Sequence, residues 1–185
     1  LEDATGTGIA VVRAMPNTPA LIGAGASAIA GGSAASAADL DWAEGLLEAV
    51  GVVVRVSESQ LDAVTWLSGS GPAYVFYLAE CLARAGEAAG LPADVAARLA
   101  RATVEGAGEL MFREAETAPA QLRVNVTSPG GTTAAALEVL MAGDGMAPLG
   151  GQGLDGIALG PRCRRAGRGQ PGQYAARRPA GPEEV

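Results

Sequence analysis

The sequence predicts an α/β layer followed by a helical region, and three observations support this fold class. Short runs rich in Val, Ile and Ala, bounded by Gly, Pro and Asn, occur between residues 9 and 56 and suit buried strands. A helical pattern lies between two of these runs, and such alternation is typical of an α/β layer. From residue 58 to 141 the apolar period becomes helical throughout.

Three strands and one helix are predicted in the first region. The strands cover residues 9–15, 26–32 and 51–57, and the helix covers residues 37–50. The stretch GAGASA at 23–28 matches the G-x-G-x-x-A form of a dinucleotide fingerprint. We reject it as a phosphate loop because prolines precede it where a strand is required, and because strand-like residues follow it.

Two long helices are predicted in the second region. The first, residues 72–89, is apolar nearly all round, so we expect most of its surface to be buried. Gly90 is placed to end this helix, and Pro92 to open the next. The second helix is expected to expose Asp94, Arg98, Arg101, Glu105 and Glu109, and to bury Val95, Leu99, Ala102 and Gly106. Both helices are rich in Ala and Gly, so they can pack closely, and one packing partner can come from a second subunit.

Composition excludes several classes of protein. The net charge is −7, and six of the 13 basic residues follow Pro161, so the rest of the chain is clearly acidic. This argues against nucleic-acid and anionic-membrane partners. The chain has no His and only two Cys, which excludes Ser-His-Asp catalysis and the usual metal sites. The uncharged stretch at residues 63–79 is too short and too interrupted to span a membrane, and we expect a cytoplasmic protein.

Three glycine- or proline-rich motifs can carry chemistry. In TSPGGTT, residues 127–133, Ser128 can cap the following helix, and glycines let backbone N–H groups converge on a carboxylate or phosphate. An ordinary capped helix is the alternative. SGSGP at 68–72 opens an apolar helix and favours a purely architectural role. RAMPNTP at 13–19 follows a strand, where ligands bind in α/β sheets, and a simple proline turn is its alternative.

These motifs together resemble the pyrroline-5-carboxylate reductase family. The resemblance runs colinearly through VVRAMPNTPALIGAG at 11–25, DAVTWLSGSGPAYVF within 62–92 and QLRVNVTSPGGTT within 118–140. It implies a partial Rossmann-type domain in residues 1–57, an all-α helical dimerisation domain in 58–142, and reduction of 1-pyrroline-5-carboxylate to L-proline with NADPH or NADH. We expect the remainder of the Rossmann-type domain to precede Leu1, and a homodimer or higher homo-oligomer.

The resemblance also implies roles for individual residues. Thr133 is implied as the catalytic residue that hydrogen-bonds the ring nitrogen and delivers or relays its proton. The substrate is expected to contact Glu58, Ser128, Gly131, Thr132 and Thr133. The cofactor is expected to contact Met15, Asn17, Thr18 and Asn125.

Two alternative functions stay open at this point. One is a related NAD(P)-dependent reductase of another small carboxylate, although similar hydroxyacid dehydrogenases use a Lys and this chain has none. The other is a non-catalytic dimerisation remnant. Residues 143–185, rich in Gly, Pro and Arg, are predicted to be mostly disordered or to derive from an altered reading frame, with a basic binding tail as the alternative.

Overall fold

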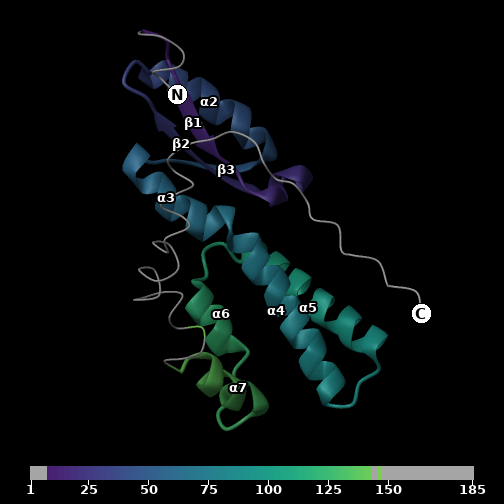
Figure 1. Cartoon of the computed structure of the whole chain (residues 1–185). Helices are drawn as coiled ribbons and strands as arrows, with labels where there is room; N and C mark the ends of the chain where they lie inside the picture. Colours follow the sequence, from purple (N-terminus) through teal and green to yellow (C-terminus); the bar gives the residue numbers. More distant parts are fainter. Residues whose placement is uncertain (1–7, 143–145, 147–185) are drawn as a thin grey trace, which may run out of the picture. The chain divides into compact units, whose positions relative to one another are not determined.

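The computed structural model describes residues 8–142 and 146 (Figure 1). The chain divides into two compact units, residues 1–137 and 138–185. All three strands and the helices up to α6 belong to the first unit, and the last helix, α7, continues into the second. The predictions for the tail after residue 142 lie outside the described residues, apart from Met146.

The first unit begins with a three-stranded sheet whose central strand is β2. Strand β1 covers Val12–Met15, β2 covers Gly25–Gly31 and β3 covers Gly51–Arg55. β2 pairs antiparallel with β1 and parallel with β3. Residues 25–31 therefore form a strand, which confirms that GAGASA is not a phosphate loop followed by a helix.

A glycine begins β3 because the two parallel strands approach closely there. Gly51 has φ +149°, and a Cβ on this residue would lie 2.0 Å from the carbonyl oxygen of Gly25. No other residue type fits that space. This contact fixes the parallel register in which Gly25 pairs with Gly51 and Ile29 with Arg55.

Helix α2, Ala37–Leu47, covers one face of the sheet and continues as a short 3₁₀ turn, η2, Glu48–Val50 (Figure 1). A capping box starts α2: Asp39 N donates to Ser36 Oγ over 3.3 Å, and Ser36 N donates to Asp39 Oδ2 over 2.8 Å. Arg55 of β3 donates to Asp41 over 2.6 Å and also pairs with Glu44, so α2 is tied to the sheet. These bonds, first that to Asp41, raise the pKa of Arg55.

The other face of β2 packs against α3, Leu61–Val64, which follows the 3₁₀ turn η3, Glu58–Gln60. The core there consists of Ala28, Ala30 and Leu61, with Met15, Val56 and Val64 packed against them. Leu61 is completely buried, and Ala28 in the centre of the sheet is too. Met15, at the end of β1, is thus held by the core.

Helices α4, Gly71–Ala88, and α5, Ala93–Arg113, form a tightly packed hairpin (Figure 1). A π-helical turn, η4, Thr65–Gly69, leads from α3 into α4. Gly90, with φ +98°, follows the last turn of α4, as predicted, and Pro92 caps α5 one position before its first residue. Two shorter helices follow, α6, Pro119–Asn125, and α7, Thr132–Leu140.

Within a single chain, the burial of the hairpin differs from two predictions. α5 buries Ala96 and Ala100, whereas Leu99 is 54% exposed and Ala102 is also exposed. The small residues face α4 because they allow a closer approach than leucine does. α4 contains no buried residue, since α5 covers only part of its surface. Among the described residues, no helix combines the length and apolar character needed to cross a membrane.

Candidate functional site

The first group of predicted site residues lies at the carboxyl end of β1. Met15 is the last residue of that strand, and Asn17 caps η1, a 3₁₀ turn over Thr18–Ile22. The Asn17 side chain is partly buried: its Oδ1 accepts from Ala26 N over 2.9 Å, and its Nδ2 donates to Ser68 O over 3.1 Å. Thr18 is exposed. Asn17 retains one N–H hydrogen and one lone pair after these bonds, so it can also bind an amide-bearing ligand.

Glu58 lies beside this group through an ion pair with Arg13 of β1. Its position is fixed from both sides, because the preceding Ser57 shares a reciprocal capping box with Gln60 at the start of η3. The Glu58 side chain remains 62% exposed. No sequence motif indicates that Arg13 is the partner of Glu58, since 45 residues separate the two.

The second group occupies the loop before α7, and here the cap prediction is wrong. α7 begins at Thr132, four residues after Ser128, and its first intrahelical bond runs from Ala135 N to Gly131 O over 3.2 Å. Gly131 is therefore the capping position. Ser128 instead opens a turn, in which its carbonyl accepts from Gly131 N over 3.1 Å and Gly130 adopts φ +72°. The Ser-Pro-Gly-Gly sequence inserts a left-handed residue that a direct serine cap does not need.

The hydrogen-bond donors available at this loop are consequently those of Thr132 and Thr133. Thr132 and Thr133 are the first two residues of α7, positions whose backbone N–H groups have no partner inside a helix. Both residues are exposed. The Gly131 N–H is already used in the turn, so the glycine shapes the loop more than it donates. Partial positive charge at the helix start adds to the attraction for a carboxylate.

Asn125 is the last residue of α6, and its Oδ1 accepts from Gln121 Nε2 over 2.8 Å. Thr127 Oγ1 donates to Arg123 O over 2.6 Å. These contacts are local: they hold the end of α6 and the start of the TSPGGTT loop together. The hydrogen bond from Gln121 holds the Asn125 side-chain oxygen, and it therefore also fixes the orientation of the Asn125 amide nitrogen.

The SGSGP motif forms the junction between η4 and α4. Ser70 is the capping residue of α4, but its side chain makes no capping hydrogen bond, and Pro72 is the second residue of the helix. The indole Nε1 of Trp66, in the π-helical turn, is buried and has no partner among the described atoms. The motif is therefore architectural in part, and it contacts the first group through Asn17.

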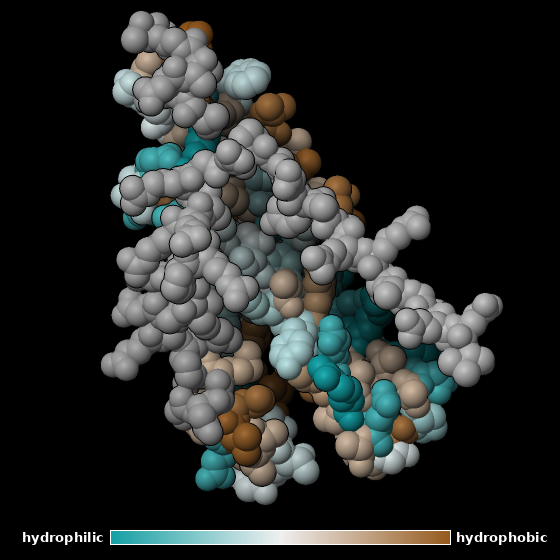
Figure 2. All heavy atoms as spheres, in the orientation of Figure 1, coloured by the Kyte–Doolittle hydropathy of each residue, from teal (hydrophilic) through white to brown (hydrophobic). Residues whose placement is uncertain are grey.

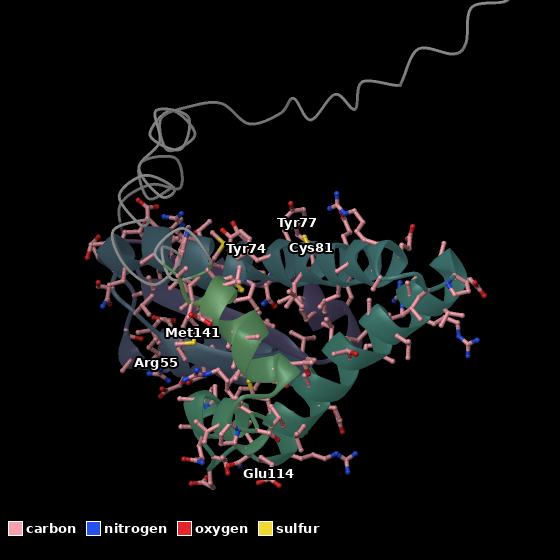
Figure 3. The ribbon with its side chains drawn as sticks, turned by 90° about the horizontal axis from the view of Figure 1, so that it is seen from below. Arg55, Tyr74, Tyr77, Cys81, Glu114 and Met141 are labelled. Carbon is pink, nitrogen blue, oxygen red and sulfur yellow. The ribbon has the colours of Figure 1, made fainter. Side chains whose placement is uncertain are left out.

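An apolar surface extends along α4 and α5. Tyr74, Tyr77 and Cys81 lie along one side of α4, as their spacing requires (Figure 3). Tyr77 is 60% exposed, and Phe112 on α5 is 78% exposed. Brown apolar side chains also lie at the surface over the end of α7 (Figure 2), where Val139 and Met141 are exposed. Exposed apolar surface of this kind marks a protein interface.

Comparison with known proteins places these features in one family. Residues 58–149 match the family model "Pyrroline-5-carboxylate reductase dimerisation". A pyrroline-5-carboxylate reductase of Synechocystis is 52% identical over 131 residues, which is 71% of this chain and 49% of that protein. One from Corynebacterium melassecola is 46% identical, over 76% of this chain and 52% of that protein. The chain thus spans about half the length of these relatives.

Solved structures agree with the sequence comparison. A pyrroline-5-carboxylate reductase from Coxiella burnetii superposes with a TM-score of 0.76 at 40% identity, covering 86% of this chain and 58% of that one. A Plasmodium falciparum pyrroline carboxylate reductase with NADP bound superposes with a TM-score of 0.68 at 28% identity, covering 89% and 63%. The expected fold class, a partial Rossmann-type sheet followed by a helical dimerisation region, is confirmed.

Proposed function

We propose, because the chain belongs to the pyrroline-5-carboxylate reductase family, that its site serves the reduction of 1-pyrroline-5-carboxylate to L-proline, the last step of proline biosynthesis. The observation that carries the proposal is the exposed start of α7. There, the first two residues of the helix, Thr132 and Thr133, are exposed, and each offers a backbone N–H of the first turn and a hydroxyl. A small cyclic imine with one carboxylate needs such a compact set of donors.

In this proposal, the residues at the start of α7 bind the substrate carboxylate and the ring nitrogen separately. The backbone N–H groups of Thr132 and Thr133 bind the carboxylate, and Ser128 adds its hydroxyl. Gly130 and Gly131 keep the loop open at that point. The Thr133 hydroxyl hydrogen-bonds the ring nitrogen and delivers or relays a proton to it, which makes the imine carbon a better hydride acceptor. Glu58 lies near the ring in this proposal and is held in place by Arg13.

The residues at the end of β1 fit the nicotinamide end of NADPH or NADH. Asn17 has a hydrogen and a lone pair left for a carboxamide, and Met15 and Thr18 line the same loop. Asn125 reaches the cofactor or substrate edge. When bound, the cofactor supplies the hydride. Its diphosphate is not held by the glycine-rich stretch 23–28, because residues 25–31 form strand β2 and no helix N-terminus follows the glycines.

The assembly that the proposal implies is a homodimer or higher homo-oligomer in the cytoplasm. The exposed apolar surface of α4 and α5 supports it, together with the dimerisation family matched by residues 58–149. The partition into residues 1–57 and 58–142 is part of the same proposal. A second candidate is a non-catalytic dimerisation module, which the match of residues 58–149 to the dimerisation family model favours.

Substitution of Thr133 tests the proposal. Thr133→Val removes the hydroxyl, keeps the size, and is expected to lower kcat for pyrroline-5-carboxylate by about 100-fold, whereas Thr133→Ser retains most of it. Thr103→Val on α5 is the matched control and leaves the rate unchanged, because Thr103 Oγ1 only donates to Leu99 O in its own helix.

Binding measured beside turnover separates the two candidates. Calorimetric titration with L-proline and with NADPH is done on the same chain. Proline binding without cofactor binding or turnover supports the non-catalytic module with a retained pocket. If the chain shows neither proline binding nor turnover, the result contradicts the assignment of α7 as the substrate site.

A further inference from the structure

The chain makes an unusual backbone junction where α4 begins. In the π-helical turn η4, Ser70 N donates to Thr65 O over 2.8 Å, five residues back. In a regular α-helix the Ser68 carbonyl would accept from the N–H of residue 72, but residue 72 is proline and has none. The next amide, that of Ala73, donates to Ser70 O instead. The Ser68 carbonyl therefore lacks its usual helical donor.

A side chain from a distant part of the sequence supplies that donor. Asn17 Nδ2 donates to Ser68 O over 3.1 Å across 51 residues, and both groups are partly buried. The other end of the same amide accepts from Ala26 N, the second residue of β2. One amide thus satisfies a carbonyl of the helix junction and an N–H of the central strand, each of which is costly to leave unpaired.

The rest of the junction is also held by side chains. Thr65 Oγ1 donates to Leu61 O over 2.8 Å, and Ser68 Oγ donates to Val64 O over 3.2 Å. A Cβ added to Gly69 would lie 3.8 Å from Met15 Sδ, so the turn lies beside the carboxyl end of β1. π-helical turns of this kind are frequent at functional sites.

We propose that Asn17 is a positioning residue that replaces the N–H missing at Pro72 and so fixes the start of α4 against the loop after β1. The backbone part of this inference stands on the two hydrogen bonds alone. Its kinetic part depends on the function proposed above, in which the β1 loop receives the cofactor. A looser junction misplaces that loop relative to the substrate while leaving the donors of α7 intact.

A double-mutant cycle tests the replacement directly. Asn17→Asp keeps the acceptor for Ala26 N and removes the donor to Ser68 O, and Pro72→Ala restores a backbone N–H at position 72. We expect Asn17→Asp to lower the Tm of the full chain and Pro72→Ala to recover roughly half of that loss when the two are combined. Pro119→Ala is the matched control, because Pro119 is the first residue of α6 and its missing N–H has no helical acceptor to serve.

Hydrogen exchange and kinetics complete the experiment. The Ser70 amide is expected to lose protection in Asn17→Asp and to regain it in the double variant. Additive Tm changes, or unchanged Ser70 protection, would contradict the claim that Asn17 replaces the N–H missing at Pro72.

In turnover assays of Asn17→Asp, we expect kcat to fall about 10-fold while the KM for pyrroline-5-carboxylate stays within about 2-fold. Equal loss in both parameters contradicts positioning. A chain that shows the coupling but reduces no pyrroline-5-carboxylate contradicts the proposed function and leaves the Asn17 bridge established.

Discussion

Gly86 of α4 faces Ala96 of α5 so closely that a Cβ on Gly86 would lie 3.1 Å from the Ala96 Cβ. The same added atom would lie 3.4 Å from Leu91 Cδ1. Leu91 can turn away, but the Ala96 methyl is joined directly to its backbone and can move only with the helix. The spacing of the hairpin therefore depends on a hydrogen atom at position 86.

Gly86→Ala is expected to destabilise the chain. A helical Gly→Ala change gains up to about 1 kcal/mol from helix propensity, and forcing the helices apart costs about 1–3 kcal/mol. We expect a net loss of about 1 kcal/mol in the free energy of unfolding, measured by urea denaturation. Gly45→Ala in α2 is the control and is expected to stabilise, since nothing lies within 4 Å of a Cβ there. Equal effects at the two glycines would show that the hairpin tolerates a wider spacing.

Removing the cap of α2 is expected to weaken the α/β layer. Ser36→Ala leaves the Asp39 N–H without its acceptor and costs about 1 kcal/mol. Thermal unfolding at neutral pH measures the loss. Ser36→Thr, which keeps a hydroxyl that can cap the helix, provides the comparison, and an equal loss in both variants would argue against the cap.

The same capping box predicts a pH dependence. The pKa of Asp39 is lowered from its ordinary 3.8, first by the side-chain hydrogen bond from Ser36, so the folded chain binds this proton less readily than the unfolded chain. The stabilisation is fully present above 3.8 and is lost as the pH falls through the lowered value of the folded state. Tm values of wild type and Asp39→Asn should therefore approach one another in acid. A Tm difference between the two proteins that stays constant with pH would show that the ionised Asp39 carboxylate is not the cause of the stabilisation.

A charge on the exposed face of α5 is expected to disrupt self-association. Leu99 is 54% exposed in the single chain, and Leu99→Asp would place a carboxylate where the proposed partner subunit packs. Analytical ultracentrifugation should show a shift toward monomer. Leu21→Asp is the control, because Leu21 is 90% exposed but belongs to η1, outside residues 58–142. An unchanged oligomer in Leu99→Asp would move the interface to another face.

Gly130 is expected to tolerate asparagine better than alanine. Its φ of +72° lies in the left-handed region, where an alanine costs about 1–2 kcal/mol and asparagine less. Gly130→Ala should therefore loosen the loop before α7 and raise the KM for pyrroline-5-carboxylate more than Gly130→Asn does. Identical kinetics in the two variants would mean that the turn is not needed for substrate binding.

Local sequence patterns predicted the elements well. Alternating apolar runs located all three strands, and Gly90 and Pro92 marked the break between α4 and α5. Periodicity failed to identify the face of α5 that packs inside one chain. The charged residues of the helix suggested that Leu99 was inside, whereas the close approach at Gly86 selects Ala96 and Ala100. Which stripe packs inside one chain depends on the partner helix and cannot be found from the helix alone.

The candidate site was predictable as motifs but not as contacts. Thr132 and Thr133 do begin a helix, yet the turn at Gly130 moved the cap from Ser128 to Gly131. The links from Asn17 to Ser68 and from Arg13 to Glu58 join residues 51 and 45 positions apart. No local pattern encodes such pairs. For the link from Asn17 to Ser68, one signal did exist. Pro72 in a helical first turn shows that the carbonyl of Ser68 needs another donor.

Strand β1 lies at one edge of the sheet that the structure describes, beside an apolar groove of about 370 Å³ whose walls include Val12, Ala14 and Trp42. Where no further strand of a Rossmann-type sheet pairs with it, such an edge is a template on which other chains can add by β-pairing, and we expect insoluble aggregates to grow from it at high concentration. Two features restrain that growth. The strand has only four residues, and Pro16 follows it immediately, offering no N–H to extend the ladder. Pro16, in the loop to which the cofactor is assigned, therefore also limits fibrous self-assembly of the chain.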